Sequence, residues 1–335
     1  MRKRLSSHVT VKKAEVAVIL VILATLLAGC AGQKAEPKTM TLRLGHEMPE
    51  DHPYHLGSLK FAELVEQKTN GAIKIVVYPN AQLGQQKALG EMVASGQLDF
   101  CLTWQGILES YDKNVGVLSL PYLFRDWDHV WKVMDGPIGQ ELLKPLEAKG
   151  IKVLTNFNNG LYNVVSRVPV KSPKDLKGLK LRVQSSPVFV EAGNLLGSVV
   201  TPTAFNEVYQ ALQTGAIDAE IQGPVNVVTS KHYEVAGYTC ETKMYYLLEP
   251  LWMNSKLFDS LPAKYQKAIL EAAHEAAVWQ REEAEREEEE DTKFLKENGM
   301  VYFTPNRDEW VQALKPLYDN HPEWADMVKK IQEVR

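Results

Sequence analysis

Apolar and polar residues alternate with strand periodicity in 174-KDLKGLKLRVQSSP-187. The apolar positions are Leu179, Leu181 and Val183, and the polar positions are Lys180, Arg182 and Gln184. This pattern predicts a strand with one apolar and one polar face. The strand runs into Ser-Ser-Pro, which predicts a helix with Ser186 as its N-cap and Pro187 at its first position.

Strand and helix patterns alternate along the rest of the chain. Strands are expected at 40–45, 73–78, 98–103 and 216–221, and helices at 54–68, 263–297, 307–318 and 322–334. Such alternation is typical of α/β folds with parallel strands. The chain has 335 residues, which favours two domains. The helix at 263–297 would extend about 50 Å, so we expect it to lie across both.

One internal similarity suggests that the two domains are alike. Residues 92-MVASGQLDFCL-102 resemble 211-ALQTGAIDAEI-221, and both fit a helix end, a glycine cap and a short strand. A match this short can also arise by chance. If it reflects a repeat, the strand ends of two lobes face each other, and ligands bind off the carboxyl ends of such strands.

The N-terminus has the pattern of an export signal. Basic residues precede an apolar run at 16–28, followed by Leu-Ala-Gly and Cys30. This predicts a lipoprotein signal peptide at 1–29, lipidation of Cys30 and a tether at 30–39. The alternative is an uncleaved anchor helix, and both place the protein outside the cytoplasm and at a membrane.

Charge and cysteine content exclude some partners. Residues 1–29 carry a net charge of +4, so their removal changes the total of −4 to −8. A chain of this charge is a poor partner for nucleic acid. Cys101 and Cys240 are expected to be small buried apolar residues, although a single disulfide between them is possible.

No catalytic motif appears, and we predict no cofactor. His46, His52 and His55 lie near Glu47, which could suggest a metal site. Their irregular spacing before a helix favours a structural or cleft-lining loop instead, so no metal is predicted. The acidic run at 282–291 is expected to be a solvated helix face with Arg286 as its partner.

Arg182 is the sharpest candidate for binding chemistry. Its guanidinium is permanently charged and fits a carboxylate through two parallel hydrogen bonds. The adjacent helix N-terminus would add positive potential. The alternative is an arginine on the polar face of a strand, exposed to water.

The whole chain after the signal resembles the DctP-type solute-binding proteins of TRAP transporters. The segments that carry this resemblance are 69-TNGAIKIVVYPNAQLG-84, 95-SGQLDF-100, 118-LSLPYLF-124, 173-PKDLKGLKLRVQSSP-187, 202-PTAFNEVYQALQTGAIDAE-220 and 261-LPAKYQKAI-269. The resemblance implies a two-lobed α/β fold like that of periplasmic binding proteins, each lobe with a mixed sheet flanked by helices. It places lobe 1 mainly at 40–160, lobe 2 mainly at 161–255 with strand crossovers, and the spanning and C-terminal helices at 256–335.

The resemblance also implies a substrate site. Arg182 matches the family arginine that pairs with the substrate carboxylate, and Phe205 matches an aromatic residue beside the ligand. Near the polar family position the register is open between Glu220 and Gln222. The expected substrate-binding residues are Arg182, Trp104, Tyr162, Phe205, Gln222, Glu220, Gln184, Glu47 and Trp252.

The chain departs from the family at two of these positions. Tyr162 occupies the position after Asn159-Gly160 at which family members often carry a second arginine. Trp104 occupies the position at which sialic-acid binders carry a glutamate. These aromatic residues favour a monocarboxylate with an apolar body. The alternative is that Trp104 is part of the core of lobe 1.

The function implied is capture of a small organic acid outside the cytoplasm and its delivery to a TRAP membrane permease. A ligand-binding lipoprotein of a sensory system would use the same chemistry. A hydrolase on an α/β scaffold is a further alternative, but the sequence shows no nucleophile with its base.

Overall fold

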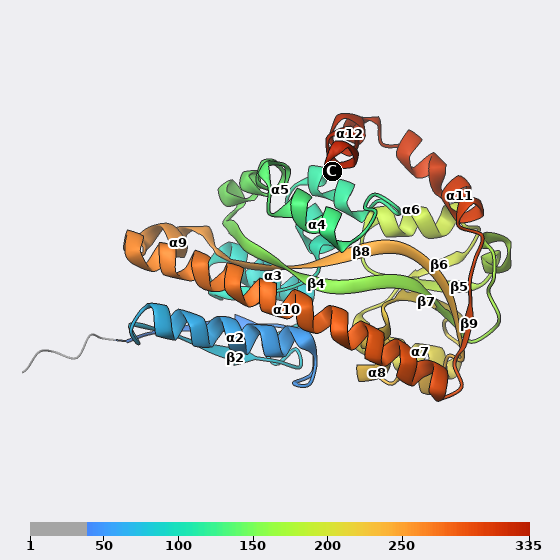
Figure 1. Cartoon of the computed structure of the whole chain (residues 1–335), viewed down its shortest axis with the longest axis horizontal. Coiled ribbons are helices and arrows are strands. Elements are labelled where there is room, and N and C mark those ends of the chain that lie inside the picture. Colours follow the sequence, from blue (N-terminus) through green and yellow to red (C-terminus); the bar gives the residue numbers. More distant parts are fainter. Residues whose placement is uncertain (1–38) are drawn as a thin grey trace, which may run out of the picture. The chain divides into compact units, whose positions relative to one another are not determined.

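A nine-stranded mixed sheet runs through the described part of the chain (Figure 1). The computed structural model describes residues 39–335; the predicted signal peptide, Cys30 and 31–38 of the predicted tether lie outside these residues. The strands are β1 (Met40–Gly45), β2 (Ile73–Tyr78), β3 (Phe100–Leu102), β4 (Ile151–Ser166), β5 (Lys180–Val183), β6 (Val199–Pro202), β7 (Ala219–Gln222), β8 (Tyr238–Asn254) and β9 (Val301–Phe303). Their order is β2-β1-β3-β8-β4-β7-β5-β6, and β9 pairs with β8.

Two long antiparallel strands join the two sides of this sheet. β4 and β8 pair from Ile151 and Asn254 to Ser166 and Tyr238. Beyond them lie the β1 side (β2, β1 and β3) and the β5 side (β7, β5 and β6). β1–β3, β5–β6 and β5–β7 are parallel pairs, whereas β3–β8 and β4–β7 are antiparallel. The predicted α/β fold with mixed sheets is therefore confirmed. The boundary between 160 and 161 falls inside β4, and the assignment of lobes stays a prediction.

Helices cover the sheet. They are α2 (Pro53–Lys68), α3 (Gln86–Ser95), α4 (Trp127–Met134), α5 (Pro137–Leu143), α6 (Pro187–Leu195), α7 (Val208–Thr214), α8 (Pro224–Thr229), α9 (Ser255–Ser260), α10 (Ala263–Glu297), α11 (Arg307–Asp319) and α12 (Ala325–Glu333). The glycines of the internal similarity both cap helices as predicted. Gly96 after α3 and Gly215 after α7 have φ values of 82° and 73°, a conformation that glycine adopts at little cost.

The start of α6 follows the rule that its sequence predicts. The side chain of Ser186 accepts hydrogen bonds from the backbone N–H groups of Val188 and Phe189, and Pro187 occupies the first helical position. Arg182 is the last residue but one of β5, the strand that precedes this cap. The turn between β5 and α6 therefore fixes Arg182 next to a helix N-terminus.

The long helix α10 lies along both sides of the sheet, as predicted (Figure 1). It packs against α2 on the β1 side, against β4 in the middle and against α8 on the β5 side. Its buried face includes Ala268, Ala272, Ala273, Ala276 and Ala277, whose small side chains permit close approach. Farther along, Gln280 donates to the Asn158 carbonyl at 3.0 Å and accepts from its N–H at 2.7 Å, which fixes α10 to the middle of β4.

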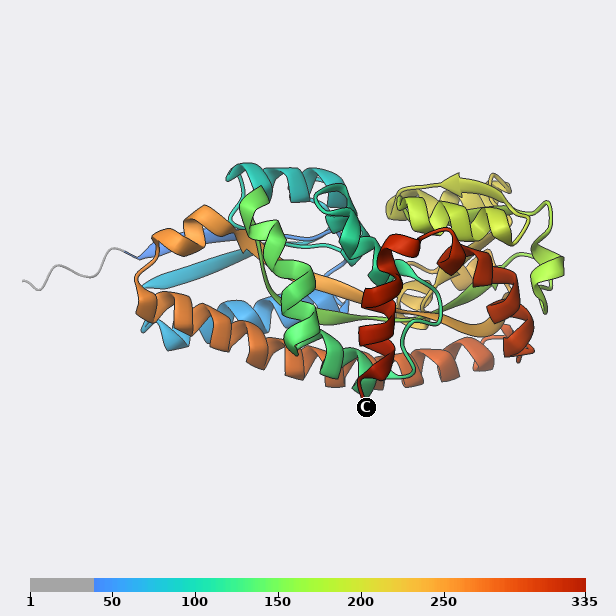
Figure 2. The ribbon, with the colours of Figure 1, turned by 90° about the horizontal axis from the view of Figure 1, so that it is seen from above.

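The C-terminal segment runs from the β5 side back over α4 (Figure 2). α11 packs against α6. Near the end of the chain, His129 of α4 bonds to the Ile331 carbonyl at 2.8 Å, and Arg125 bonds to the Gln332 and Val334 carbonyls. This segment is a further connection, besides β4, β8 and α10, between the two sides of the sheet.

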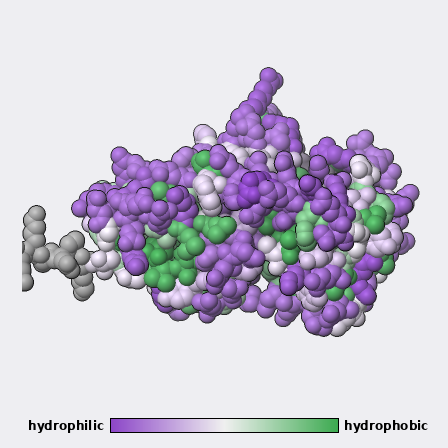
Figure 3. Space-filling model, turned by 60° about the horizontal axis from the view of Figure 1, so that its bottom comes forward, coloured by the Kyte–Doolittle hydropathy of each residue, from purple (hydrophilic) through white to green (hydrophobic). Residues whose placement is uncertain are grey.

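The surface gives little sign of a membrane-crossing element. None of the helices within 39–335 combines the length and apolar character that a crossing needs. On the face shown in Figure 3, apolar side chains form separate areas among polar ones.

Cys101 and Cys240 are both free and buried, which confirms their expected place in the core.

Candidate binding pocket

A cavity of about 330 Å³ opens where the parallel strands of both sides end. Half of its lining residues lie at the end of β1, β3, β5, β6 or β7 or closely follow it. They are Glu47, Trp104, Arg182, Gln184, Ser185, Thr203, Ala204, Phe205 and Gln222, and the other half are Met48, Gln85, Gln86, Lys87, Gly106, Ile107, Ser110, Asn159 and Tyr162. Such a volume is at the small end of the range for small-molecule sites.

Arg182 is buried in the wall of this cavity, with 3% of its surface exposed. Its Nε donates to the Thr203 carbonyl at 3.1 Å, which fixes the plane of the guanidinium. Its Nη1 is buried and has no hydrogen-bond partner within the described residues. Burial lowers the pKa of Arg182, while the neighbouring carboxyl groups of Glu220 and Glu47 oppose this effect. The group stays charged at physiological pH, so an uncompensated donor lies in the pocket wall.

Glu47 brings a carboxyl group to the same cavity. Burial raises its pKa to about 7, against the opposing effects of the Arg182 charge and a hydrogen bond from Gln86. At neutral pH this carboxyl group is therefore divided between its neutral and charged forms. It can donate or accept a hydrogen bond, and it only partly neutralises Arg182.

A chain of hydrogen bonds supports the polar end of the pocket. The Tyr162 hydroxyl donates to Asn159 Oδ1 at 2.7 Å and accepts from Asn226 Nδ2 at 2.7 Å. Asn226 Nδ2 also donates to Gln222 Oε1 at 2.9 Å. The carbonyl end of Gln222 is thus occupied by Asn226, which leaves its amide NH₂ as the group that a ligand can meet.

His52 also belongs to this chain of hydrogen bonds. Its contacts and those of His46 show which partners the histidines before and at the start of α2 have. Burial lowers the pKa of His52 to about 4, so the ring is neutral. Its Nδ1 accepts from the Tyr54 N–H at the start of α2, and its Nε2 lies 2.9 Å from Asn226 Oδ1. Burial likewise lowers the pKa of His46 to about 3, and its Nε2 lies 3.1 Å from His55 Nδ1. Within 39–335 no group of three or more His, Cys, Asp or Glu residues is arranged to hold a metal ion.

Two expected site residues lie outside the cavity lining. Glu220 is fully buried, and its Oε1 lies 2.7 Å from His232 Nδ1. It is the cross-strand neighbour of Arg182 and opposes the lowering of the arginine's pKa, but it does not line the cavity. Trp252 is fully buried as well, and its Nε1 donates to Thr103 Oγ1 at 3.1 Å, so it belongs to the core. The other seven expected residues line the pocket.

Trp104 is both a pocket residue and a core residue, the two alternatives that the sequence left open. It lines the pocket, yet only 3% of its surface is exposed. Its ring packs edge-on against Phe189 of α6, with 5.4 Å between the ring centroids. It is therefore a core residue with one edge in the pocket.

Comparison with known proteins decides the family. The model of the bacterial extracellular solute-binding protein family 7, DctP, matches residues 44–323. The chain belongs to this DctP family. It is 33% identical over 324 residues to the 2,3-diketo-L-gulonate-binding periplasmic protein YiaO of Escherichia coli K12, covering 94% of this chain and 98% of that protein. It is 34% identical over 307 residues to the C4-dicarboxylate-binding periplasmic protein DctP of Rhodobacter capsulatus, covering 90% and 92%.

A solved structure in the family has the same fold. The TRAP periplasmic solute-binding protein of Xanthobacter autotrophicus Py2, with bound β-D-galacturonate, gives a TM-score of 0.85 at 30% identity. The match covers 88% of this chain and all of that protein. As a DctP-family protein the chain is an extracytoplasmic solute-binding protein and not an enzyme.

Sequence patterns missed part of this DctP-family pocket. Asn226 lies 64 residues from Tyr162 and 174 residues from His52, and nothing local marks any of these residues as partners of the others. Asn159 could have been found from the Asn-Asn-Gly run in the middle of the long strand, since small polar residues there break an otherwise apolar pattern. Gln85 and Gln86 stand at the start of α3, and only the fold brings them to Glu47.

Proposed function

We propose that the protein captures a small organic acid with a polar, hydroxylated body, such as a hexuronate, and delivers it to a TRAP permease. The observation that carries this proposal is Arg182, a buried cation whose Nη1 has no partner within 39–335 and which lines the cavity. A ligand carboxylate would supply the missing acceptors through charge-assisted hydrogen bonds. In a closed pocket of low dielectric this pairing is stronger than at the surface.

The polarity of the cavity supports a hydroxylated body over an apolar one. Around Arg182 the lining carries carboxamides, hydroxyls and a carboxyl group, at Gln85, Gln86, Gln184, Gln222, Asn159, Ser110, Ser185, Thr203 and Glu47. An apolar ligand would leave Arg182 Nη1 and Gln184 Oε1, which have no partner within the described residues, unpaired at a cost of about 1–3 kcal/mol each. The aromatic residues give weaker support for an apolar ligand body than the sequence alone indicates. Tyr162 uses its hydroxyl within the polar network, and Trp104 is mostly part of the core.

Relatives support the same class of ligand. One is named for 2,3-diketo-L-gulonate, and one was solved with β-D-galacturonate; both are acids of oxidised sugars. A C4-dicarboxylate is the second candidate, because a relative carries that name and Lys87 places a second cation at the cavity. Lys87 is exposed, so its pairing with a second carboxylate would be screened by solvent.

Thermal unfolding in the presence of an acid library tests the proposal. The library contains hexuronates, aldonates, C4-dicarboxylates and apolar monocarboxylates, each at several concentrations. A ligand present at 100 times its Kd stabilises by about 2.7 kcal/mol, so a specific binder is easily detected. We expect hexuronates or aldonates to give the largest shifts. Stabilisation by apolar monocarboxylates alone would contradict the polar-body assignment, and no stabilisation by any acid would contradict the function.

We further propose that the two sides of the sheet move as lobes. The lining comes from both, with Glu47 and Trp104 on the β1 side and Arg182 and Gln222 on the β5 side. Closure of the lobes at 40–160 and 161–255 around β4 and β8 would exclude water from the ion pair.

Lipid anchoring through Cys30 is also a proposal, supported by the small residues directly before this cysteine. Replacement Cys30→Ala should move the protein from the membrane fraction to the soluble fraction, with ligand affinity unchanged. Retention in the membrane fraction would favour an uncleaved helix instead.

A further inference from the structure

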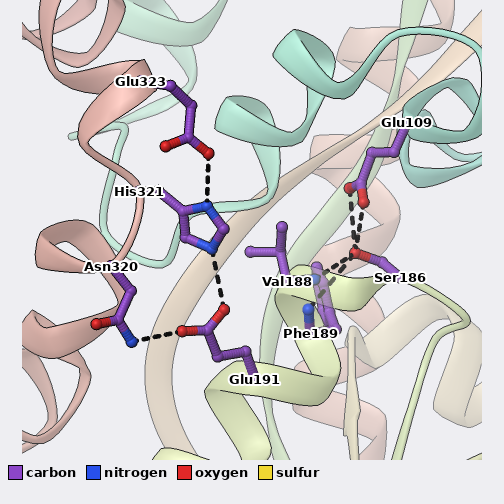
Figure 4. A network of polar contacts seen from close by, with 8 residues as sticks. All are labelled: Glu109, Ser186, Val188, Phe189, Glu191, Asn320, His321 and Glu323. Atoms are coloured by element: carbon purple, nitrogen blue, oxygen red, sulfur yellow. Dashed lines mark hydrogen bonds and ion pairs between the residues drawn. The ribbon is translucent and has the colours of Figure 1, made fainter.

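Glu109 connects two segments that follow strands on opposite sides of the sheet. It lies in the 3₁₀ helix η1 (Gln105–Ser110), which follows β3. It accepts a hydrogen bond from the Ser186 hydroxyl, which lies 2.8 Å from Oε2 and 3.1 Å from Oε1 (Figure 4). Ser186 is the N-cap of α6, which follows β5. Since β8, β4 and β7 separate β3 from β5 in the sheet, this bond spans three strands.

The bond lies immediately beside the pocket. Ile107 and Ser110, on either side of Glu109, line the cavity from one wall. Gln184 and Ser185, directly before Ser186, line it from the other. Separation of these two walls must break the contact between Glu109 and Ser186. The contact therefore opposes the opening through which a bound solute would leave.

Both carboxylate oxygens of Glu109 act as hydrogen-bond acceptors in this contact. The Ser186 hydroxyl already accepts from the Val188 and Phe189 N–H groups, at 3.2 and 3.5 Å, so its single proton is free for Glu109. Ser119 donates a second hydroxyl to Glu109 Oε1 at 2.5 Å. A negative charge behind the N-cap also stabilises the start of α6 through its dipole. Burial raises the pKa of Glu109, while the two serine hydrogen bonds and the charge of His321 oppose the rise.

A second contact in the same view joins α6 to the C-terminal segment and not to η1. Asn320 Nδ2 donates to Glu191 Oε1 at 2.7 Å, and His321 Nε2 lies 2.9 Å from Glu191 Oε2 (Figure 4). Asn320 and Glu191 have no hydrogen bond to η1 among the described residues. Asn320→Ala is therefore a matched control, because it removes a hydrogen bond to α6 without affecting Glu109.

We propose that Glu109 is a latch, a positioning residue whose hydrogen bond to Ser186 holds the η1 wall and the β5–α6 wall together and slows solute release. The latch rests on the proposed function for the identity of the solute, but not for the contact itself. A ring contact between Trp104 and Phe189 joins the same two walls and gives the latch an apolar neighbour.

Release kinetics test the latch directly. D-glucuronate is the probe, and Trp104 at the pocket edge provides a fluorescence signal for stopped-flow measurements. In Glu109→Gln the dissociation rate should rise about 5- to 20-fold, since the carboxamide oxygen can still accept from Ser186 but the bond across the walls loses its charge assistance. The association rate should change by less than about twofold, because the latch forms only after the walls meet. Ser186→Ala should raise dissociation similarly, and the double variant should add little to the larger single effect.

Other kinetic outcomes count against the latch. An unchanged dissociation rate in Glu109→Gln overturns it. So do fully additive effects of the two substitutions, because residues that act through one bond cannot be independent. An increase of equal size in Asn320→Ala would assign the effect to general loosening of α6, which also overturns it.

Hydrogen exchange in the ligand-free protein tests the contact separately from the function. In Glu109→Gln, exchange should rise in peptides from η1 and from the start of α6, and remain unchanged in α10. Uniform acceleration over the whole protein, or none, would overturn the latch. If the wild-type protein bound no sugar acid, the proposed ligand class would fail, and this exchange pattern alone would decide the latch.

Discussion

Replacement of Arg182 by lysine separates charge from geometry in the proposed carboxylate site. The guanidinium is held in one plane by the bond from Nε to the Thr203 carbonyl, which leaves Nη1 for the ligand. Lysine keeps the positive charge but has no second donor with which to hold that plane. One ligand oxygen then loses its charge-assisted bond inside a closed pocket. Truncation of one partner of a buried charge pair costs about 2–4 kcal/mol, or about 30- to 700-fold in Kd.

Isothermal titration calorimetry on the purified protein, with the strongest acid from the thermal screen, measures this loss. The matched control is Arg167→Lys, since Arg167 lies near the end of β4, is partly exposed and pairs with Asp218 outside the pocket. The control should bind like wild type. Arg182→Lys should lower the free energy of unfolding by about 1–3 kcal/mol, because the partly buried Thr203 carbonyl loses its donor, and should leave the fold intact. Wild-type affinity in Arg182→Lys would refute the assignment, and an equal loss in the control would show that the effect is not local.

Three further predictions concern the same pocket. Glu47 has a raised pKa of about 7 and ionises beside Arg182, so affinity for an acid should fall as pH rises through 7; calorimetry between pH 6 and 8 should show this fall for wild type and a flat profile for Glu47→Gln. Tyr162→Phe removes a hydroxyl that serves two buried carboxamides, and should cost about 1–3 kcal/mol in affinity and stability combined, whereas Tyr246→Phe, whose hydroxyl lies outside the pocket, should leave affinity intact. Trp104→Ala should lower the free energy of unfolding by about 3–5 kcal/mol as a core truncation and also weaken binding; normal stability in urea would contradict its place in the core.

Local patterns predicted the elements that depend on local physics. β1, β2 and α10 have the predicted bounds, and Ser186 and the two capping glycines act as their sequences indicate. These features depend on periodicity, a missing Cβ or a side-chain cap, all of which are visible within a few residues. The strand and the cap that place Arg182 are also local, but its role as a binding residue is a prediction that rests on the family resemblance.

The parts that could not be predicted depend on register across the sheet. Trp252 pairs with Cys101 on one neighbouring strand and with Val153 on the other, and irregularities in the β4–β8 register decide which face its ring occupies. Glu220 bonds to His232 and does not line the pocket, although it is the direct cross-strand partner of Arg182. The partnership of Asn226 with Tyr162 and His52 arises only when α8 meets the long strands and the start of α2. No single stretch of sequence contains that information.

Calorimetric titration of the wild-type protein with D-glucuronate and with D-glucose tests the central claim most directly. The two sugars share a ring and most hydroxyl groups, and only the acid carries the carboxylate that Arg182 would bind. Loss of that carboxylate should cost at least about 2–4 kcal/mol, because it would leave the buried arginine unpaired. The account predicts specific binding of D-glucuronate and no measurable binding of D-glucose. Equal affinity for both sugars would contradict it.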